Sequence, residues 1–165
     1  MVTKAFRECL IDVYRGEVAG EAVFESMLGI AEGAEQQYVI GSMLQLETEG
    51  KAIIRPLLMR LGLSMLEDPE GRAAGSAGGA QLNGLPWVER FAVVHETVRS
   101  NYLPRYLELA TLVSPDEDRE AARIAAFMGS HERAILASAA NVMAGTADPV
   151  APLVALLHFP LPRPV

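Results

Sequence analysis

Apolar side chains recur at three- and four-residue intervals along most of this 165-residue chain, and this spacing constrains its fold more than any other feature. Near the start of the chain, for example, Phe6, Leu10 and Val13 would share one face of a helix. Alternation of apolar and polar residues, which is typical of strands, never persists. We therefore predict an all-α fold whose long helices cover approximately residues 3–31, 34–62, 86–112 and 114–144.

The expected connections differ in length. Gly29 and Gly33 predict a short turn after the first helix. Residues 63–85 are rich in glycine and alanine, so we predict a mobile crossover loop or linker there. A connection of this length makes sense if the chain travels the length of a bundle before the third helix starts. Pro56 and Pro104 should kink or interrupt the second and third helices.

The last third of the chain contains clear helix boundaries. Ser114, followed by a proline and two acidic residues, predicts the start of the fourth helix, and Gly145 predicts its end. We expect residues 146–165 to form a C-terminal extension. Within it, about 148–158 should add a short helical segment, and the remainder should lie extended along the surface.

Composition indicates one globular domain, here residues 1–165. Hydrophobic residues make up 50% of the chain and charged residues 21%, which suits a well-packed core. The net charge of −7 argues against a nucleic-acid partner. Cys9 is the single cysteine, which excludes an internal disulfide and fits a reducing compartment. Because we find neither a signal-peptide pattern nor about 18 consecutive uncharged apolar residues, we expect a cytoplasmic protein with no membrane partner.

Carboxylates and imidazoles near the predicted inward faces are the chemically informative residues. Glu17 and Glu21 lie in the first predicted helix, Glu47 in the second, His95 in the third and His131 in the fourth. Burying such groups is unfavourable unless a partner or a metal ion compensates their charge. Either the core therefore contains a polar site, or these groups lie beside the packed faces, where each histidine would hydrogen-bond a glutamate or a carbonyl group.

The lengths and order of the helices, together with these polar groups, resemble the ferritin-like superfamily over most of residues 3–145. One segment from each predicted helix carries the resemblance: YRGEVAGEAVFESM, QLETEGKAIIRPLL, VVHETVRSNYL and FMGSHERAILASA. The resemblance implies a four-helix bundle with a long crossover between its second and third helices. It also implies a possible metal site inside the bundle.

A di-iron member of such a family takes a glutamate from each of two helices and a Glu-x-x-His pair from each of the other two. By resemblance, the candidate metal ligands here are Glu21, Glu47, Glu96 and His131. Gly50 stands where the second helix needs its histidine, and Met128 stands where the fourth needs its glutamate. The di-iron motif is therefore incomplete.

A site for a single metal ion is an alternative to the di-iron centre. Glu21, Glu47 and His131 would suit zinc, iron or manganese, because imidazole and carboxylate groups are ligands for all three. If the second helix is shifted in register, Glu49 is the alternative to Glu47. In the alternative interpretation without a metal site, Glu17 and Glu21 form a solvated flank of the helix, and Glu132 faces water.

A pocket between helices is a further possibility, because such pockets are common small-molecule sites. Tyr102 and Tyr106 form an amphipathic patch on the third predicted helix that would line one. The candidate pocket residues are Glu17, His95, Tyr102 and Met128.

The second predicted helix carries apolar residues on two faces, although a four-helix bundle needs only one. The extra face should be covered either by the leucine-rich C-terminal segment, which contains Leu153 and Leu157, or by a partner helix. A homodimer is the expected partner, since two-fold assemblies are the commonest.

These observations lead us to expect a small-molecule-binding or protein-interaction domain without a working di-iron site and without a resident cofactor. The alternative is a divergent metal-dependent oxidoreductase that holds iron, manganese or zinc inside the bundle.

Overall fold

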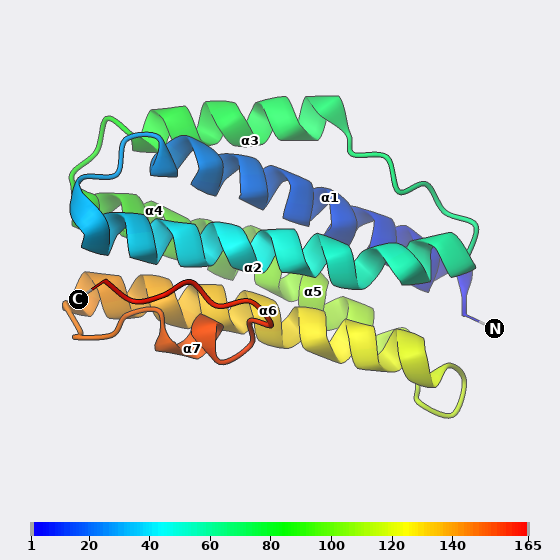
Figure 1. Cartoon of the computed structure of the whole chain (residues 1–165). Helices are drawn as coiled ribbons and strands as arrows, with labels where there is room; N and C mark the ends of the chain where they lie inside the picture. The colour runs from blue at the N-terminus through cyan, green and yellow to red at the C-terminus, as the bar shows by residue number, and fades with distance from the viewer. Residues whose placement is uncertain (1, 165) are drawn as a thin grey trace.

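The computed structural model describes residues 2–164, and within that range the chain forms helices and no strand (Figure 1). The all-α prediction is confirmed. No helix in the described part of the chain is long and apolar enough to cross a membrane. The elements are α1 (Lys4–Leu28), α2 (Gly33–Arg60), α3 (Pro69–Leu82), α4 (Trp87–Thr97), the π-helical turn η1 (Val98–Tyr102), α5 (Leu103–Thr111), α6 (Arg119–Ala144) and α7 (Ala151–Val154).

Four long rods form the body of the molecule: α1, α2, the continuous α4–η1–α5 segment, and α6 (Figure 1). Each rod packs against two neighbours that run in the opposite direction, so that α1 contacts α2 and α5, and α6 contacts α2, α4 and α5. The second and third rods run in the same direction because the connection between them returns along the bundle. As a result α1 and α6 lie diagonally opposite each other across the core.

The connection between α2 and α4 contains a helix, so the expectation of a structureless loop over 63–85 is wrong for α3. Asp68 begins this helix by accepting a backbone hydrogen bond of 3.1 Å in its first turn. The glycines that argued for a loop instead allow close packing, because a Cβ atom at Gly75 would lie 2.3 Å from the carbonyl oxygen of Ala19 on α1. Contact with α1 therefore offsets the low helix propensity of glycine, about 1 kcal/mol per residue.

The two internal prolines are accommodated differently. α2 continues through Pro56 to its end at Arg60 without a break. Ahead of Pro104, the third rod widens into the η1 turn, where the Leu103 N–H bonds to the Val98 carbonyl five residues earlier. Because Pro104 has no N–H for the regular α-helical bond, the extra residue in this turn lets the rod continue. Such turns occur frequently at functional sites.

The helix α6 begins later than the sequence indicated. Ser114 and Glu117 form a separate turn, in which the Ser114 N–H donates to the Glu117 carboxylate (2.9 Å) and the Glu117 N–H donates to the Ser114 hydroxyl (3.3 Å). Asp118 caps α6 instead, accepting from the Ala121 N–H at 3.0 Å. Gly145 ends the helix as predicted, with a φ of 67° that favours glycine.

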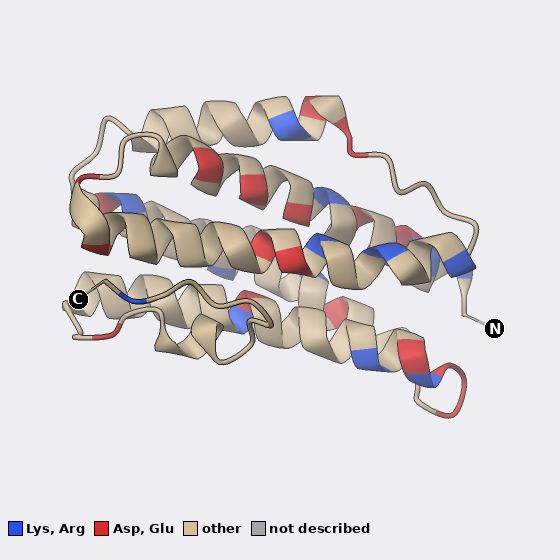
Figure 2. Ribbon diagram, viewed as in Figure 1, with Lys and Arg blue, Asp and Glu red and all other residues tan. Residues whose placement is uncertain are grey.

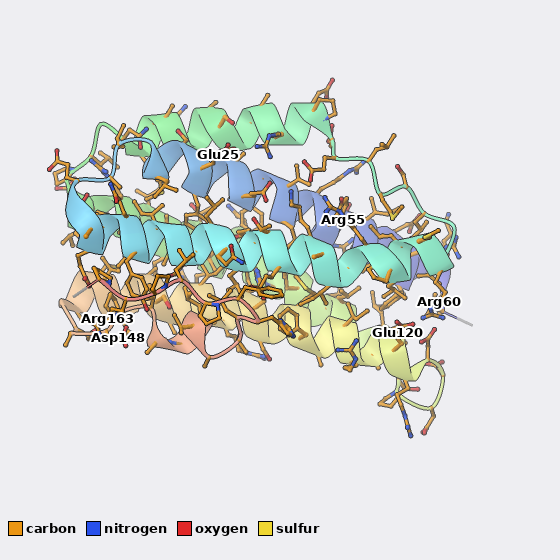
Figure 3. The ribbon with its side chains drawn as sticks, in the orientation of Figure 1. Glu25, Arg55, Arg60, Glu120, Asp148 and Arg163 are labelled. Carbon is orange, nitrogen blue, oxygen red and sulfur yellow. The ribbon has the colours of Figure 1, made fainter. Side chains whose placement is uncertain are left out.

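The C-terminal segment covers the second apolar face of α2, as one of the two alternatives predicted. Leu153 is fully buried, and the Glu49 carboxylate accepts backbone hydrogen bonds from His158 (2.7 Å) and Phe159 (3.0 Å). Arg163 pairs with Asp148 at 3.4 Å, as the labelled side chains indicate (Figure 3). This packing accounts for part of the extra apolar surface of α2, and the expected homodimer stays a prediction.

The core consists of two apolar clusters, one toward each end of the bundle. One cluster is built around Phe6, Leu10 and Leu57, and the other around Met27 and Phe91. Between them lies a layer of ionisable side chains. This layer is the candidate functional site.

Candidate metal centre and adjoining cavity

Every rod contributes at least one polar side chain to the layer between the apolar clusters. Glu17 comes from α1, Glu47 from α2, Tyr106 from α5, and His131 and Glu132 from α6. All five are buried. We refer to these residues as the core polar cluster.

His131 lies at the centre of the core polar cluster. Its Nε2 atom is 3.2 Å from Glu17 Oε2 and 4.0 Å from Glu47 Oε2, and its Nδ1 atom is 3.5 Å from Glu132 Oε2. The Tyr106 hydroxyl donates a hydrogen bond of 2.7 Å to Glu17 Oε1. Two carboxylates and an imidazole on the diagonally opposed α1 and α6 therefore meet on the axis of the bundle, with a third carboxylate beside them.

Two atoms of this cluster are buried without a hydrogen bond from any described residue: Glu17 Oε2 and His131 Nδ1. Glu17 Oε2 is close to the imidazole, but the contact does not have hydrogen-bond geometry, and His131 Nε2 lies 3.3 Å from the Leu46 carbonyl oxygen. Leaving a polar atom buried and unpaired is unfavourable by about 1–3 kcal/mol. One ring nitrogen of His131 and one oxygen each of Glu17 and Glu132 lie within 4.8 Å of one another, which suits a shared metal ion.

Glycines provide the space that the carboxylates occupy. A Cβ atom at Gly50 would lie 1.9 Å from Glu17 Oε2 and 3.2 Å from His131 Nε2, and one at Gly20 would lie 2.5 Å from Glu47 Oε1. Gly50 is the position at which the resemblance to ferritin-like proteins led us to expect a histidine. The Glu17 carboxylate fills the space that such a side chain would enter. The absence of a side chain at Gly50 therefore allows Glu17 to point inward.

Burial changes the proton affinities of the core polar cluster. It raises the pKa of Glu17 to about 7, against the opposing influence of His131. Burial, together with the nearby Glu17 and Glu132 carboxylates, raises the pKa of Glu47 well above its ordinary value. Burial disfavours the His131 cation, but Glu17 and Glu132 outweigh that effect and raise its pKa. Without a cation, the cluster therefore retains protons near neutral pH.

A cavity of about 270 Å³ reaches the core polar cluster from the side of the bundle where α1, α3 and α4 meet. Glu47, Glu132, Tyr102 and Tyr106 contribute to its lining. The remaining wall is mostly apolar and includes Val23, Phe24, Leu82, Val94, Val98 and Ile135. Tyr102 belongs to the η1 turn, so the irregular turn of the third rod forms part of this wall.

The structure places Glu21 outside the core polar cluster. Its carboxylate pairs with Lys51 (2.5 Å) and Arg72 (3.0 Å), and Lys51 also pairs with Glu67 (2.5 Å). These contacts attach the start of α3 and the preceding connection to α1 and α2, where acidic and basic residues adjoin (Figure 2). Glu17 and Glu21 are one helical turn apart, and the small rotation between them turns Glu17 toward the axis and Glu21 toward α3.

The other predicted site residues have separate environments. Glu96 is exposed and bonds to Arg99 at 2.7 Å. His95 is half-buried on α4 and is not among the described residues that line the cavity. Met128 is fully buried within the apolar cluster around Phe6. Of the predicted metal ligands the structure thus brings together Glu47 and His131, and of the predicted pocket residues it brings Glu17 and Tyr102 to the cluster or cavity.

The sequence interpretation missed Glu132, which was expected to face water but is 3% exposed. The helix α6 is buried over a wide arc because α2, α4, α5 and α7 all pack against it. Small residues on several faces of this helix, including Ala125, Gly129 and Ala139, are the signal that could have indicated such burial.

Comparison with known proteins yields no relative. No family model matches the chain, and neither does any curated protein or solved structure searched. The geometry of the core polar cluster therefore carries the functional argument.

The space at Gly50 can be tested directly. We expect Gly50→Ala to destabilise the protein by roughly 1–3 kcal/mol, because the added methyl group would displace the Glu17 carboxylate. Gly78→Ala is the matched control, since a Cβ there would be 4.0 Å from its nearest neighbour and the change should stabilise α3 by about 1 kcal/mol. Urea unfolding measures both. Equal stability of the two variants would contradict this account of Gly50.

The pKa of Glu17 predicts a pH dependence for the protein without bound metal. Its folded pKa of about 7 exceeds the ordinary value of 4.5, so the stability that it contributes is present at low pH and is lost as the pH rises through 7. The raised pKa values of Glu47 and His131 act in the same direction. Between pH 5 and 8 we expect a loss on the order of 3 kcal/mol in the free energy of unfolding, measured by chemical denaturation.

The matched variants for this pH experiment are Glu17→Gln and Glu21→Gln. The first should reduce the decline in stability, because it removes the contribution of Glu17 while Glu47 and His131 remain. The second should keep the full decline, because burial raises the pKa of Glu21 but Lys51, Thr48 and Arg72 together lower it. Stability of the unmodified protein that rises between pH 5 and 8 would refute this assignment.

Proposed function

We propose that this protein is a ferritin-like bundle that binds one divalent metal ion in its core, through Glu17, His131 and Glu132, and admits a small molecule to the adjoining cavity. The family assignment is supported by the order of the rods, with parallel second and third rods joined by a long connection. The metal site is supported by the ligand atoms on α1 and α6 that lie within 4.8 Å of one another.

The observation that carries the proposal is the pair of buried atoms without hydrogen bonds, Glu17 Oε2 and His131 Nδ1. A buried carboxylate cluster is unfavourable unless its charge is compensated. A divalent ion would neutralise part of that charge and would take Glu17 Oε2, one of the two unpaired atoms, as a ligand. Glutamate and histidine ligands of this kind are suitable for zinc, iron or manganese.

The ligand set favours one ion rather than a pair. The di-iron arrangement needs two histidines and four glutamates. The core polar cluster has a single histidine, His131, and three glutamates, while Gly50 and Met128 occupy two of the remaining ligand positions. The third rod contributes Tyr106 in place of an inward carboxylate.

A metal-dependent oxidoreductase is the second candidate function. It is favoured by one observation, namely that the cavity extends to Glu132 and would give a substrate access to an ion bound there. A protein that only binds a small molecule would use the same cavity without catalysing a reaction.

Metal content provides the test. We expect protein stripped with a chelator to take up one zinc, iron(II) or manganese(II) ion per chain, measured by elemental analysis after desalting. Glu17→Gln and His131→Ala should reduce uptake at least tenfold, because each removes a ligand. Glu21→Gln and Glu96→Gln, which alter glutamates outside the core polar cluster, should retain one ion per chain.

Circular dichroism of each variant separates loss of ligand from loss of fold. A saturating ion at about 100 times its dissociation constant should also stabilise the folded protein by about 2.7 kcal/mol. Uptake of two ions per chain would contradict the single-ion site, and absence of uptake by a folded protein would contradict the metal site altogether.

A further inference from the structure

The cavity beside the core polar cluster is acidic in character. Its titratable lining residues, among those that the structure describes, are the carboxylic acids Glu47 and Glu132 and the phenols Tyr102 and Tyr106. The buried lysine closest in sequence to Glu47 is Lys51, which pairs with Glu21 and Glu67 instead. A ligand head group in this cavity therefore meets carboxylate oxygens and tyrosine rings.

The rest of the cavity would suit a compact apolar group. Its walls include the side chains of Val94, Val98 and Ile135, and Gly78 on α3 leaves its outer side open. A cavity of about 150 Å³ accommodates a benzene ring, so about 270 Å³ accommodates one ring with a short substituent.

From this combination we infer that the cavity binds a small primary amine, with its ammonium group between Glu47 and Glu132 and its apolar body against Val94, Val98 and Ile135. Carboxylates attract the cation directly, and tyrosine rings add attraction through their faces. An anionic ligand of the same shape would meet carboxyl oxygens and no basic side chain among the described residues that line the cavity.

This inference names the ligand class for the cavity of the proposed function, on which it rests, and does not depend on an ion being present. The described residues that line the cavity include carboxyl groups and no basic side chain. In the metal-free protein an ammonium group would replace protons that the core polar cluster otherwise retains. A divalent ion held by Glu132 would take over part of this role, so the cavity favours a cation in both states, and more strongly in the metal-free state.

Three probes of nearly equal shape test the head group: benzylamine, benzyl alcohol and benzoate. Binding to chelator-treated protein near pH 7 is measured by calorimetry or by chemical-shift titration. We expect benzylamine to bind at least tenfold more tightly than benzyl alcohol, and benzoate to bind more weakly than either. The order should persist after loading with zinc, with a smaller ratio between the amine and the alcohol.

Two pairs of measurements locate the binding. Glu47→Gln should weaken benzylamine at least tenfold and leave benzyl alcohol within about twofold, which also shows that the cavity remains intact. Gly78→Leu should block all three probes, because its side chain would enter the cavity, whereas Ala80→Leu on the exposed side of α3 should not.

The inference is overturned if benzyl alcohol or benzoate binds metal-free protein as tightly as benzylamine, if none of the probes binds, or if Gly78→Leu leaves binding unchanged. Metal uptake measured on the same samples keeps the two proposals apart. One zinc ion per chain without amine selectivity would refute this inference alone, and amine selectivity without metal uptake would refute the metal site alone.

Discussion

The rest of the structure depends on how the bundle compensates the charge buried around His131. Carboxylates from α1, α2 and α6 lie within 4.0 Å of the ring nitrogens of His131, between two apolar clusters. Taking these groups out of water is strongly unfavourable, and their mutual contacts offset only part of that effect. Protons offset the remainder in the free protein, and a metal ion would do so in the form that we propose.

The same requirement explains the surrounding architecture. Gly20 and Gly50 leave room for carboxylates where ordinary side chains would collide with them. A second layer of charge, formed by Glu21, Lys51 and Arg72, lies outside the core and attaches α3 to the bundle. Because α3 contributes to the cavity wall, this outer network also shapes access to the buried site. Glu17 and Glu21 are one helical turn apart on α1 and have different roles: Glu17 belongs to the core polar cluster, and Glu21 belongs to the outer network of ion pairs.

Sequence periodicity was sufficient to predict the four long rods, because each repeats apolar residues over many turns. It could not determine how far each helix is rotated about its own axis. We therefore predicted Glu21 as the metal ligand of the first helix, whereas in the structure Glu17 faces the core. The helix α6 is buried on several sides and therefore has no single inward face. For this reason periodicity did not predict that Glu132 is buried. The helix α3 was missed because glycine lowers helix propensity, and only tertiary contact at Gly75 shows why glycine is needed there.

The most direct test of the central claim is an anomalous-difference map from crystals of the protein grown with zinc or manganese. The account predicts one strong peak per chain, within about 2.0–2.3 Å of ligand atoms from Glu17, His131 and Glu132. A pair of peaks about 3.5–4 Å apart would restore the two-ion arrangement. A peak among Glu21 and Glu67, or an empty core at full metal concentration, would contradict the account.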